Sequence, residues 1–139
     1  MLSQKQIAVL QRFFEQQSAV VAGYVFGSFA KGTQSGSSDI DIAVLVSKDV
    51  APNAYADLTG QYTVDLSEGL GREVEVVILN AAPPFLKFQV FRYGQRLFER
   101  DRKQSRGFLA ASLLEYFDFE PFKRSMEQRI VQRLKEQPL

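Results

Sequence analysis

Three short runs of β-branched and other apolar residues limit what this chain can fold into more than any other feature. The runs occupy residues 20–26 (VVAGYVF), 40–46 (IDIAVLV) and 74–79 (VEVVIL). Runs of this length and composition are typical of strands buried in a sheet. The first two are joined by too few residues for a long crossover helix, so we expect a mixed sheet.

Helical patterns surround these predicted strands. Ser3 and Gln6 have the spacing of a capping box and precede apolar residues at helical intervals, which predicts a helix over residues 3–17. Other helices are predicted at residues 52–70, 83–94 and 101–114, with a short edge strand at residues 97–99. The predicted fold class is therefore α/β, a small mixed β-sheet with flanking helices.

The segment between the first two predicted strands carries the residues most suggestive of chemistry. It reads GSFAKGTQSGSSDID over residues 27–41 and ends in two acids separated by one residue. Because alternate residues of a strand point to the same side of a sheet, Asp39 and Asp41 are expected to direct their carboxylates into one space. Two neighbouring carboxylates stay ionised at low cost only when a cation lies between them.

The available ligands indicate which cation this would be. The chain contains no histidine and no cysteine, and ligation by oxygen alone favours Mg²⁺ or Mn²⁺ over zinc. Mg²⁺ is usually held by one or two carboxylates together with substrate phosphates, so a phosphate ligand is implied. Gly27 and Ser28 are candidates to bind it through a backbone N–H group and a hydroxyl. Glu75 is the best candidate for a third acid; Glu73 shares its parity but lies at the entrance of the strand.

Composition sets the remaining limits. A chain of 139 residues with 45% hydrophobic residues suits one domain with a substantial core. A net charge of +1 gives no indication of nucleic-acid or membrane binding. The absence of cysteine, of an apolar signal segment and of any run long enough to span a membrane leads us to expect a soluble, cytoplasmic protein.

The end of the chain is more basic than the rest, with nine basic and six acidic residues over positions 100–139. We expect residues 102–139 to form a helical C-terminal extension, packed on the core or on a partner. An apolar stripe on this extension either packs on the protein's own core or contributes to a partner surface. The stripe consists of Phe122, Met126, Ile130 and Leu134, and the neighbouring residues that would join a partner surface are Tyr116, Phe117, Phe119, Lys123, Arg124, Arg129 and Arg133.

The pattern Gly27-Ser28, ten residues, then Asp39-Ile40-Asp41 resembles the signature of the polymerase-β-type nucleotidyltransferases. The segments at residues 71–80 (GREVEVVILN) and 91–101 (FRYGQRLFERD) are similar to those of its minimal branch, the MNT antitoxins of HEPN–MNT toxin–antitoxin pairs. The resemblance covers roughly residues 5–101 and implies a polymerase-β-like nucleotidyltransferase core at residues 1–101.

The resemblance also implies roles for single residues. Gly27 and Ser28 would bind the nucleotide triphosphate, and Asp39 and Asp41 would be the paired Mg²⁺ ligands. Glu75 stands where the family usually has its third Asp, and Ile78 replaces a second acid in that segment. The extra methylene of Glu75 puts the turnover rate in question more than nucleotide binding. Two residues of the following loop, Lys31 and Thr33, would neutralise the β- or γ-phosphate, although for Lys31 plain solvent exposure is an equally good interpretation.

The function implied by the resemblance is transfer of AMP from ATP to a tyrosine of a cognate HEPN ribonuclease toxin. Two Mg²⁺ ions held by the acids would act on the attacking and leaving oxygens, with Glu75 as a ligand and proton acceptor. Two alternatives remain open from the residues: nucleotidyl transfer to a small molecule, and an antitoxin that masks its toxin by binding alone. No direct nucleic-acid binding is expected.

Overall fold

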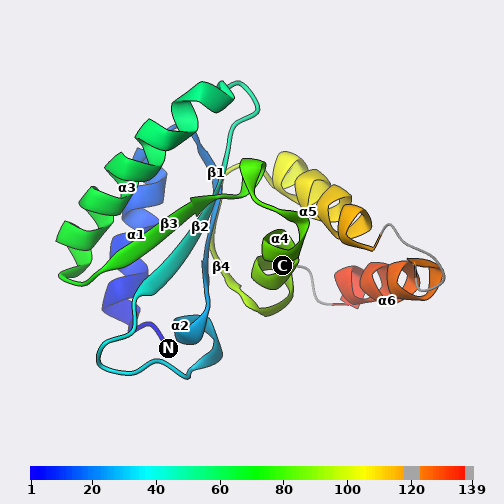
Figure 1. The fold of residues 1–139 in the computed structure, drawn as a ribbon, viewed down its shortest axis with the longest axis horizontal. Coiled ribbons are helices and arrows are strands. Elements are labelled where there is room, and N and C mark those ends of the chain that lie inside the picture. Colours follow the sequence, from blue (N-terminus) through cyan, green and yellow to red (C-terminus); the bar gives the residue numbers. More distant parts are fainter. Residues whose placement is uncertain (118–122, 137–139) are drawn as a thin grey trace.

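A four-stranded mixed sheet forms the centre of the protein. The computed structural model describes residues 1–117 and 123–136. The strands lie in the order β3-β2-β1-β4, where β1 is antiparallel to both neighbours and β2 is parallel to β3 (Figure 1). The predicted mixed sheet is thereby confirmed. The bounds are β1 Val20–Phe26, β2 Ile40–Val46, β3 Val74–Ile78 and β4 Gln95–Glu99.

Helices cover both faces of this sheet. The first helix carries the predicted capping box: Gln6 N–H donates to the Ser3 hydroxyl and Ser3 N–H donates to the Gln6 side chain. The one-turn helix α2 has four residues, too few to show a periodic pattern in the sequence. The helices are α1 Gln4–Gln16, α2 Ser28–Lys31, α3 Tyr55–Leu70, α4 Pro84–Tyr93, α5 Arg102–Tyr116 and α6 Lys123–Glu136, with 3₁₀ turns at Pro52–Ala54 and Leu79–Ala81.

The alternation of β2 divides the core into two clusters. Ile40, Ile42 and Val44 pack on the side of α1 and α3, whereas Ala43 and Leu45 pack on the side of α4 and α5. Each fully buried isoleucine, valine or leucine side chain contributes about 1.5–3 kcal/mol to folding. Asp41 has the parity of the second set, so its carboxylate lies on the α4/α5 face.

Arg100 connects the two ends of the core. It follows β4, and its guanidinium donates hydrogen bonds to the carbonyls of Phe14, Gln17 and Val20 at 2.9–3.3 Å. The carbonyls of Phe14 and Gln17 at the end of α1 each accept one backbone N–H bond. The arginine adds a second donor to both and thereby acts as a C-terminal cap. The first helix and the last strand of the sheet are thus held together.

The C-terminal helices α5 and α6 lie to the right of α4 in Figure 1. Asp101 caps α5 by accepting from Gln104 N–H at 3.0 Å. In α6, Ile130 and Leu134 are partly buried against the cluster on the α4/α5 face, which agrees with the core interpretation for that half of the stripe. Phe119, Phe122 and the side chain of Met126 lie outside the described residues, as do the side chains of Lys123 and Arg124. The division into a core and an extension stays a prediction.

None of the helices in the described part of the chain is long and apolar enough to cross a membrane.

Candidate active site

A glycine turn at the end of β1 begins the candidate site. Gly27 has φ +70° and ψ −149°, a backbone conformation that residues with a Cβ rarely adopt. A Cβ at this position would also collide with the Asp41 carboxylate. The turn therefore requires glycine twice, for its conformation and for its close approach to Asp41, and it leads directly into α2 at Ser28.

A row of carboxylates crosses the sheet beside this turn. In the strand register, Asp41 of β2 lies opposite Phe26 of β1 on one side and Glu75 of β3 on the other. Asp39 precedes β2 and is exposed. The pKa of Asp41 is raised by burial, by the negative charges of Glu75 and Asp39, and by a hydrogen bond shared with Glu75. Asp41 and Glu75 are therefore adjacent as predicted, and Asp39 is near enough to act on Asp41 electrostatically.

Glu73 occupies the margin of this row. Its carbonyl accepts a hydrogen bond from Ile40 N–H at 3.1 Å, and its side chain is exposed ahead of β3. The direct neighbour of Asp41 on β3 is Glu75, so the structure favours Glu75 over Glu73 as the third acid.

The arrangement of these acids shows whether they could serve as ligands of Mg²⁺. Residues 1–117 and 123–136 contain no group of three or more His, Cys, Asp or Glu side chains arranged to hold a metal ion. What they contain is a pair of adjacent carboxylates with unbalanced negative charge, and a third carboxylate nearby. These oxygens fit Mg²⁺ in its usual mode, in which one or two carboxylates bind the ion and substrate phosphates complete its ligands.

Arg72 holds the loop between α2 and β2, a role that the sequence did not reveal. Its Nε donates to the Ser38 carbonyl at 3.0 Å, and its Nη2 donates to the carbonyls of Ser35 and Gly36 at 3.0 and 3.2 Å. The guanidinium also lies over the Phe29 ring, 4.9 Å from its centroid. The arginine fixes the backbone just before Asp39 from a position that is distant in the sequence. No local pattern could have indicated these contacts.

Lys31 and Thr33 lie on the rim of the site. Both side chains are exposed. Lys31 Nζ is 5.4 Å from the centroid of the Tyr93 ring at the end of α4, and Thr33 N–H donates to the Ser28 carbonyl at 2.9 Å. Their phosphate-binding role stays a prediction.

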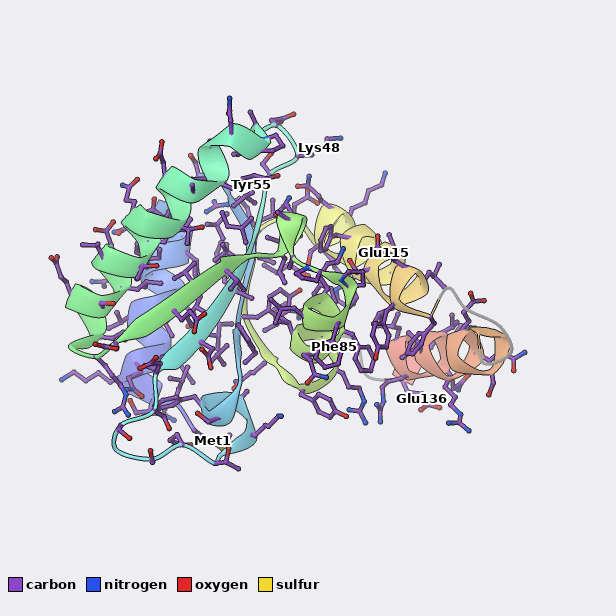
Figure 2. The ribbon with its side chains drawn as sticks, viewed as in Figure 1. Met1, Lys48, Tyr55, Phe85, Glu115 and Glu136 are labelled. Atoms are coloured by element: carbon purple, nitrogen blue, oxygen red, sulfur yellow. The ribbon has the colours of Figure 1, made fainter. Side chains whose placement is uncertain are left out.

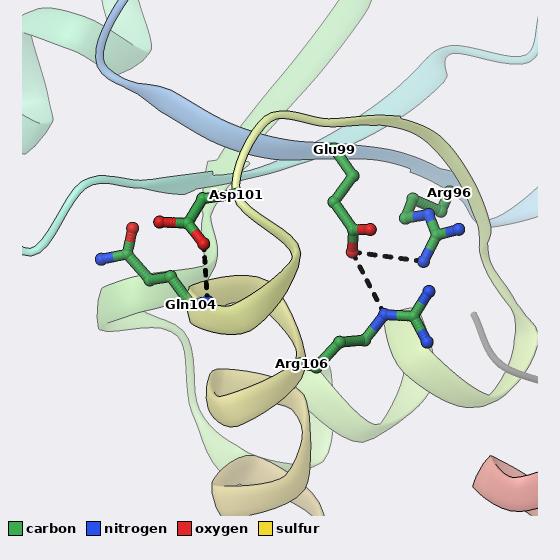
Figure 3. Close-up of polar contacts among 5 residues, drawn as sticks. All are labelled: Arg96, Glu99, Asp101, Gln104 and Arg106. Atoms are coloured by element: carbon green, nitrogen blue, oxygen red, sulfur yellow. Dashed lines mark hydrogen bonds and ion pairs between the residues drawn. The ribbon is translucent and has the colours of Figure 1, made fainter.

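A different carboxylate, Glu99, lies on the same face of the sheet but is fully paired. Its Oε2 is 3.3 Å from Arg96 Nη1 and 3.2 Å from Arg106 Nε, and Figure 3 shows this contact between β4 and α5. Burial alone would raise the pKa of Glu99, but the hydrogen bond from Arg106 and the positive charges of Arg96 and Arg106 outweigh burial and lower it. This network joins β4 to α5 and belongs to the fold rather than to the site.

Comparison with known proteins bears on the family and the fold. A relative named protein adenylyltransferase MntA, from Shewanella oneidensis, is 37% identical over 75 residues, which are 54% of this chain and 51% of the relative. The aligned stretch thus spans about half the length of that relative.

Solved structures match over nearly the whole chain. A toxin–antitoxin structure with AMP-PNP has a TM-score of 0.63 and 27% identity, covering 96% of this chain and 99% of that one. A tri-AMPylated Shewanella oneidensis HEPN toxin in complex with an MNT antitoxin gives a TM-score of 0.58 at 21% identity, covering 94% of this chain and 96% of the matched chain. The second match bears on the fold alone.

The family model described as polymerase beta, nucleotidyltransferase, matches residues 9–103. These residues include the glycine turn, all three candidate acids and the whole sheet. Since the match covers well over half of the chain, this protein belongs to the polymerase beta nucleotidyltransferase family.

Proposed function

We propose that this protein is an antitoxin that transfers AMP from ATP to a tyrosine of a cognate HEPN-domain ribonuclease toxin and thereby neutralises it in the cytoplasm. The observation that carries the proposal is the adjacent pair Asp41 and Glu75 beside the Gly27 turn. The name of the curated relative supports AMP transfer to protein, and the AMP-PNP in a matching toxin–antitoxin structure supports ATP as the donor.

The reaction forms a bond between the tyrosine oxygen and the α-phosphorus and breaks the bond from that phosphorus to the bridging oxygen, releasing pyrophosphate. Gly27 and Ser28 bind the triphosphate through backbone N–H groups and a hydroxyl, and Lys31 and Thr33 face its outer phosphates. Glu75 accepts the phenolic proton. No histidine is needed, because positioning and electrostatic stabilisation carry this kind of phosphoryl chemistry.

Asp39, Asp41 and Glu75 would hold Mg²⁺, with two ions as the proposed number. When bound, Mg²⁺ supplies charge neutralisation at the triphosphate and a lowered pKa for the attacking hydroxyl. The raised pKa of Asp41 is consistent with this assignment: burial is its largest cause, and the negative charges of Glu75 and Asp39, which a bound cation would balance, raise it further.

The test is intact-mass spectrometry of a HEPN-domain protein encoded in the neighbouring reading frame, after incubation with this protein, ATP and Mg²⁺. We expect the acceptor to gain whole AMP groups, and peptide mapping to locate them on tyrosine. An acceptor that binds tightly but stays unmodified would support the masking antitoxin instead. A neighbourhood without a HEPN-domain protein would favour transfer to a small molecule.

A further inference from the structure

An open groove of about 690 Å³ runs between α4 and α6. Its apolar part is formed by Phe88, Phe117 and Ile130, and its basic part by Arg92, Arg129 and Arg133. The combination of an apolar floor with arginines is typical of protein-binding surfaces.

The charge of this groove is unbalanced. Among the described residues, none of its three arginines forms an ion pair. The acid that lines the groove, Glu136, accepts a hydrogen bond from Gln132 at 2.7 Å. The groove is therefore positively charged on a chain whose net charge is only +1, and it is complementary to an acidic ligand.

The groove adjoins the candidate active site. Arg92 lies at the end of α4, where its guanidinium carbon is 4.9 Å from the centroid of the Tyr93 ring. Lys31, which follows the glycine turn, also lies near Tyr93, with its Nζ 5.4 Å from the centroid of that ring. A protein segment in the groove would thus lead toward the nucleotide.

The aromatic residues at the groove favour protein over nucleic acid as its ligand. Single-stranded nucleic acids need free ring faces on which bases stack. Phe88 instead stacks on Tyr116 of α5, with ring centroids 4.4 Å apart and planes 7° from parallel. Phe85, which Figure 2 labels on α4, is 60% exposed, and its ring centroid is 6.3 Å from that of Tyr116, but it does not line the groove.

We propose that the α4–α6 groove binds an acidic segment of the AMP-accepting protein and holds its tyrosine at the nucleotide. This inference rests on the proposed function, and it adds the surface that selects the acceptor. Arg129 and Arg133 attract the segment, while the apolar floor receives its non-polar side chains.

The first test compares two charge-reversed double variants. Arg129→Glu with Arg133→Glu alters the groove. Arg102→Glu with Lys135→Glu makes the same change in net charge at exposed positions that do not line it. For AMP transfer to the neighbouring HEPN-domain protein, the groove variant should raise the KM for the acceptor by about tenfold, because charges at an interface act mainly on association. Its KM for ATP and its kcat at saturating acceptor should be unchanged, and the control variant should behave as wild type.

A second test locates the bound segment directly. The chain contains no cysteine, so Gln128→Cys provides a single attachment point for a photoreactive group inside the groove. Lys135→Cys provides the matched point outside it. We expect crosslinks to the acceptor from position 128 and not from position 135.

The outcomes separate this inference from the proposed function. If wild-type protein transfers AMP but both double variants lose the same affinity, or both cysteine positions crosslink equally, the groove is not the docking surface. If a labelled single-stranded RNA binds and only the groove variant loses it, with acceptor affinity unchanged, the inference is overturned. If no AMP is transferred, the proposed function fails, while affinity and crosslinking still decide whether the acceptor binds in the groove.

Discussion

Asp41 and Glu99 are two partly buried carboxylates on the same face of one sheet, and their surroundings are opposite. Glu99 meets two arginines and its pKa is lowered. The pKa of Asp41 is raised by burial and by the negative charges of two further acids. The fold thus balances the charge of Glu99, which joins β4 to α5, with two arginines. It leaves the charge of Asp41, next to the glycine turn, without such a balance. An uncompensated charge of this kind indicates a site that a ligand completes.

The largest expected effect is on the uncompensated side of this comparison. Asp39→Asn with Asp41→Asn should lower AMP transfer on the order of 10³-fold or more, as expected for removal of the groups that stabilise charge in the transition state. The fold should be retained, because the change relieves repulsion between acids. Transfer is measured by intact mass and the fold by circular dichroism. A double variant with near wild-type turnover would show that the metal-site hypothesis is wrong.

Glu99 should instead affect stability. Glu99→Ala leaves Arg96 and Arg106 without their partner, and their side chains are only about a quarter exposed. We expect a loss of about 1–3 kcal/mol in the free energy of unfolding, measured by urea denaturation, because unpaired half-buried charges are costly.

The pH dependence of this effect has a definite sign. Because the pKa of Glu99 is lowered by folding, its contribution to stability is present above its ordinary value of 4.5 and is lost as the pH falls through the lowered pKa. The stability difference between wild type and Glu99→Gln should therefore shrink in acid. A difference that stays constant from pH 7 into the acid range would contradict the ion-pair interpretation.

A smaller effect separates Glu75 from Glu73. Glu75→Gln should lower AMP transfer by about tenfold or more, since Glu75 adjoins Asp41 across the β2–β3 pair. Glu73→Gln is the matched control, with the same change of charge at the exposed entrance of the strand, and should remain within about twofold of wild type. The reverse order would assign the third ligand to Glu73.

The smallest effect concerns the stability of the metal-free protein. The pKa of Asp41 is raised by folding, so Asp41 lowers stability as the pH rises above the ordinary value of 3.8. Asp41→Asn should then raise Tm at pH 7 by roughly 1–3 °C, which corresponds to a few tenths of a kcal/mol, and the gain should vanish in acid. Addition of Mg²⁺ with ATP should stabilise the wild type and not the variant.

The sequence predicted the parts of this arrangement that depend on local pattern. The strands at residues 20–26 and 40–46 have their predicted bounds, because β-branched runs specify buried strands. Parity together with position inside the strand was sufficient to choose Glu75 as the third acid, and Glu75 is the neighbour of Asp41 on β3. Contacts between distant segments were beyond it: Arg72 binds a loop more than thirty positions away, and Arg100 binds carbonyls eighty or more positions before it. The exposed position of Asp39, ahead of the strand, also depends on where that loop is held.

The cap formed by Arg100 has a consequence for the order of events during synthesis. Translation produces α1 first, but the guanidinium that caps its final carbonyls arrives only after β4 has been made. One edge of the central strand β1 likewise stays unpaired until β4 has been made, because β4 is its partner on that side. A nascent chain that has not yet emerged past residue 100 therefore exposes an open sheet edge, the kind of surface that recruits chaperones or aggregates. Once Arg100 has emerged, both edges of β1 can be paired and the end of α1 can be bonded to the residue that follows β4.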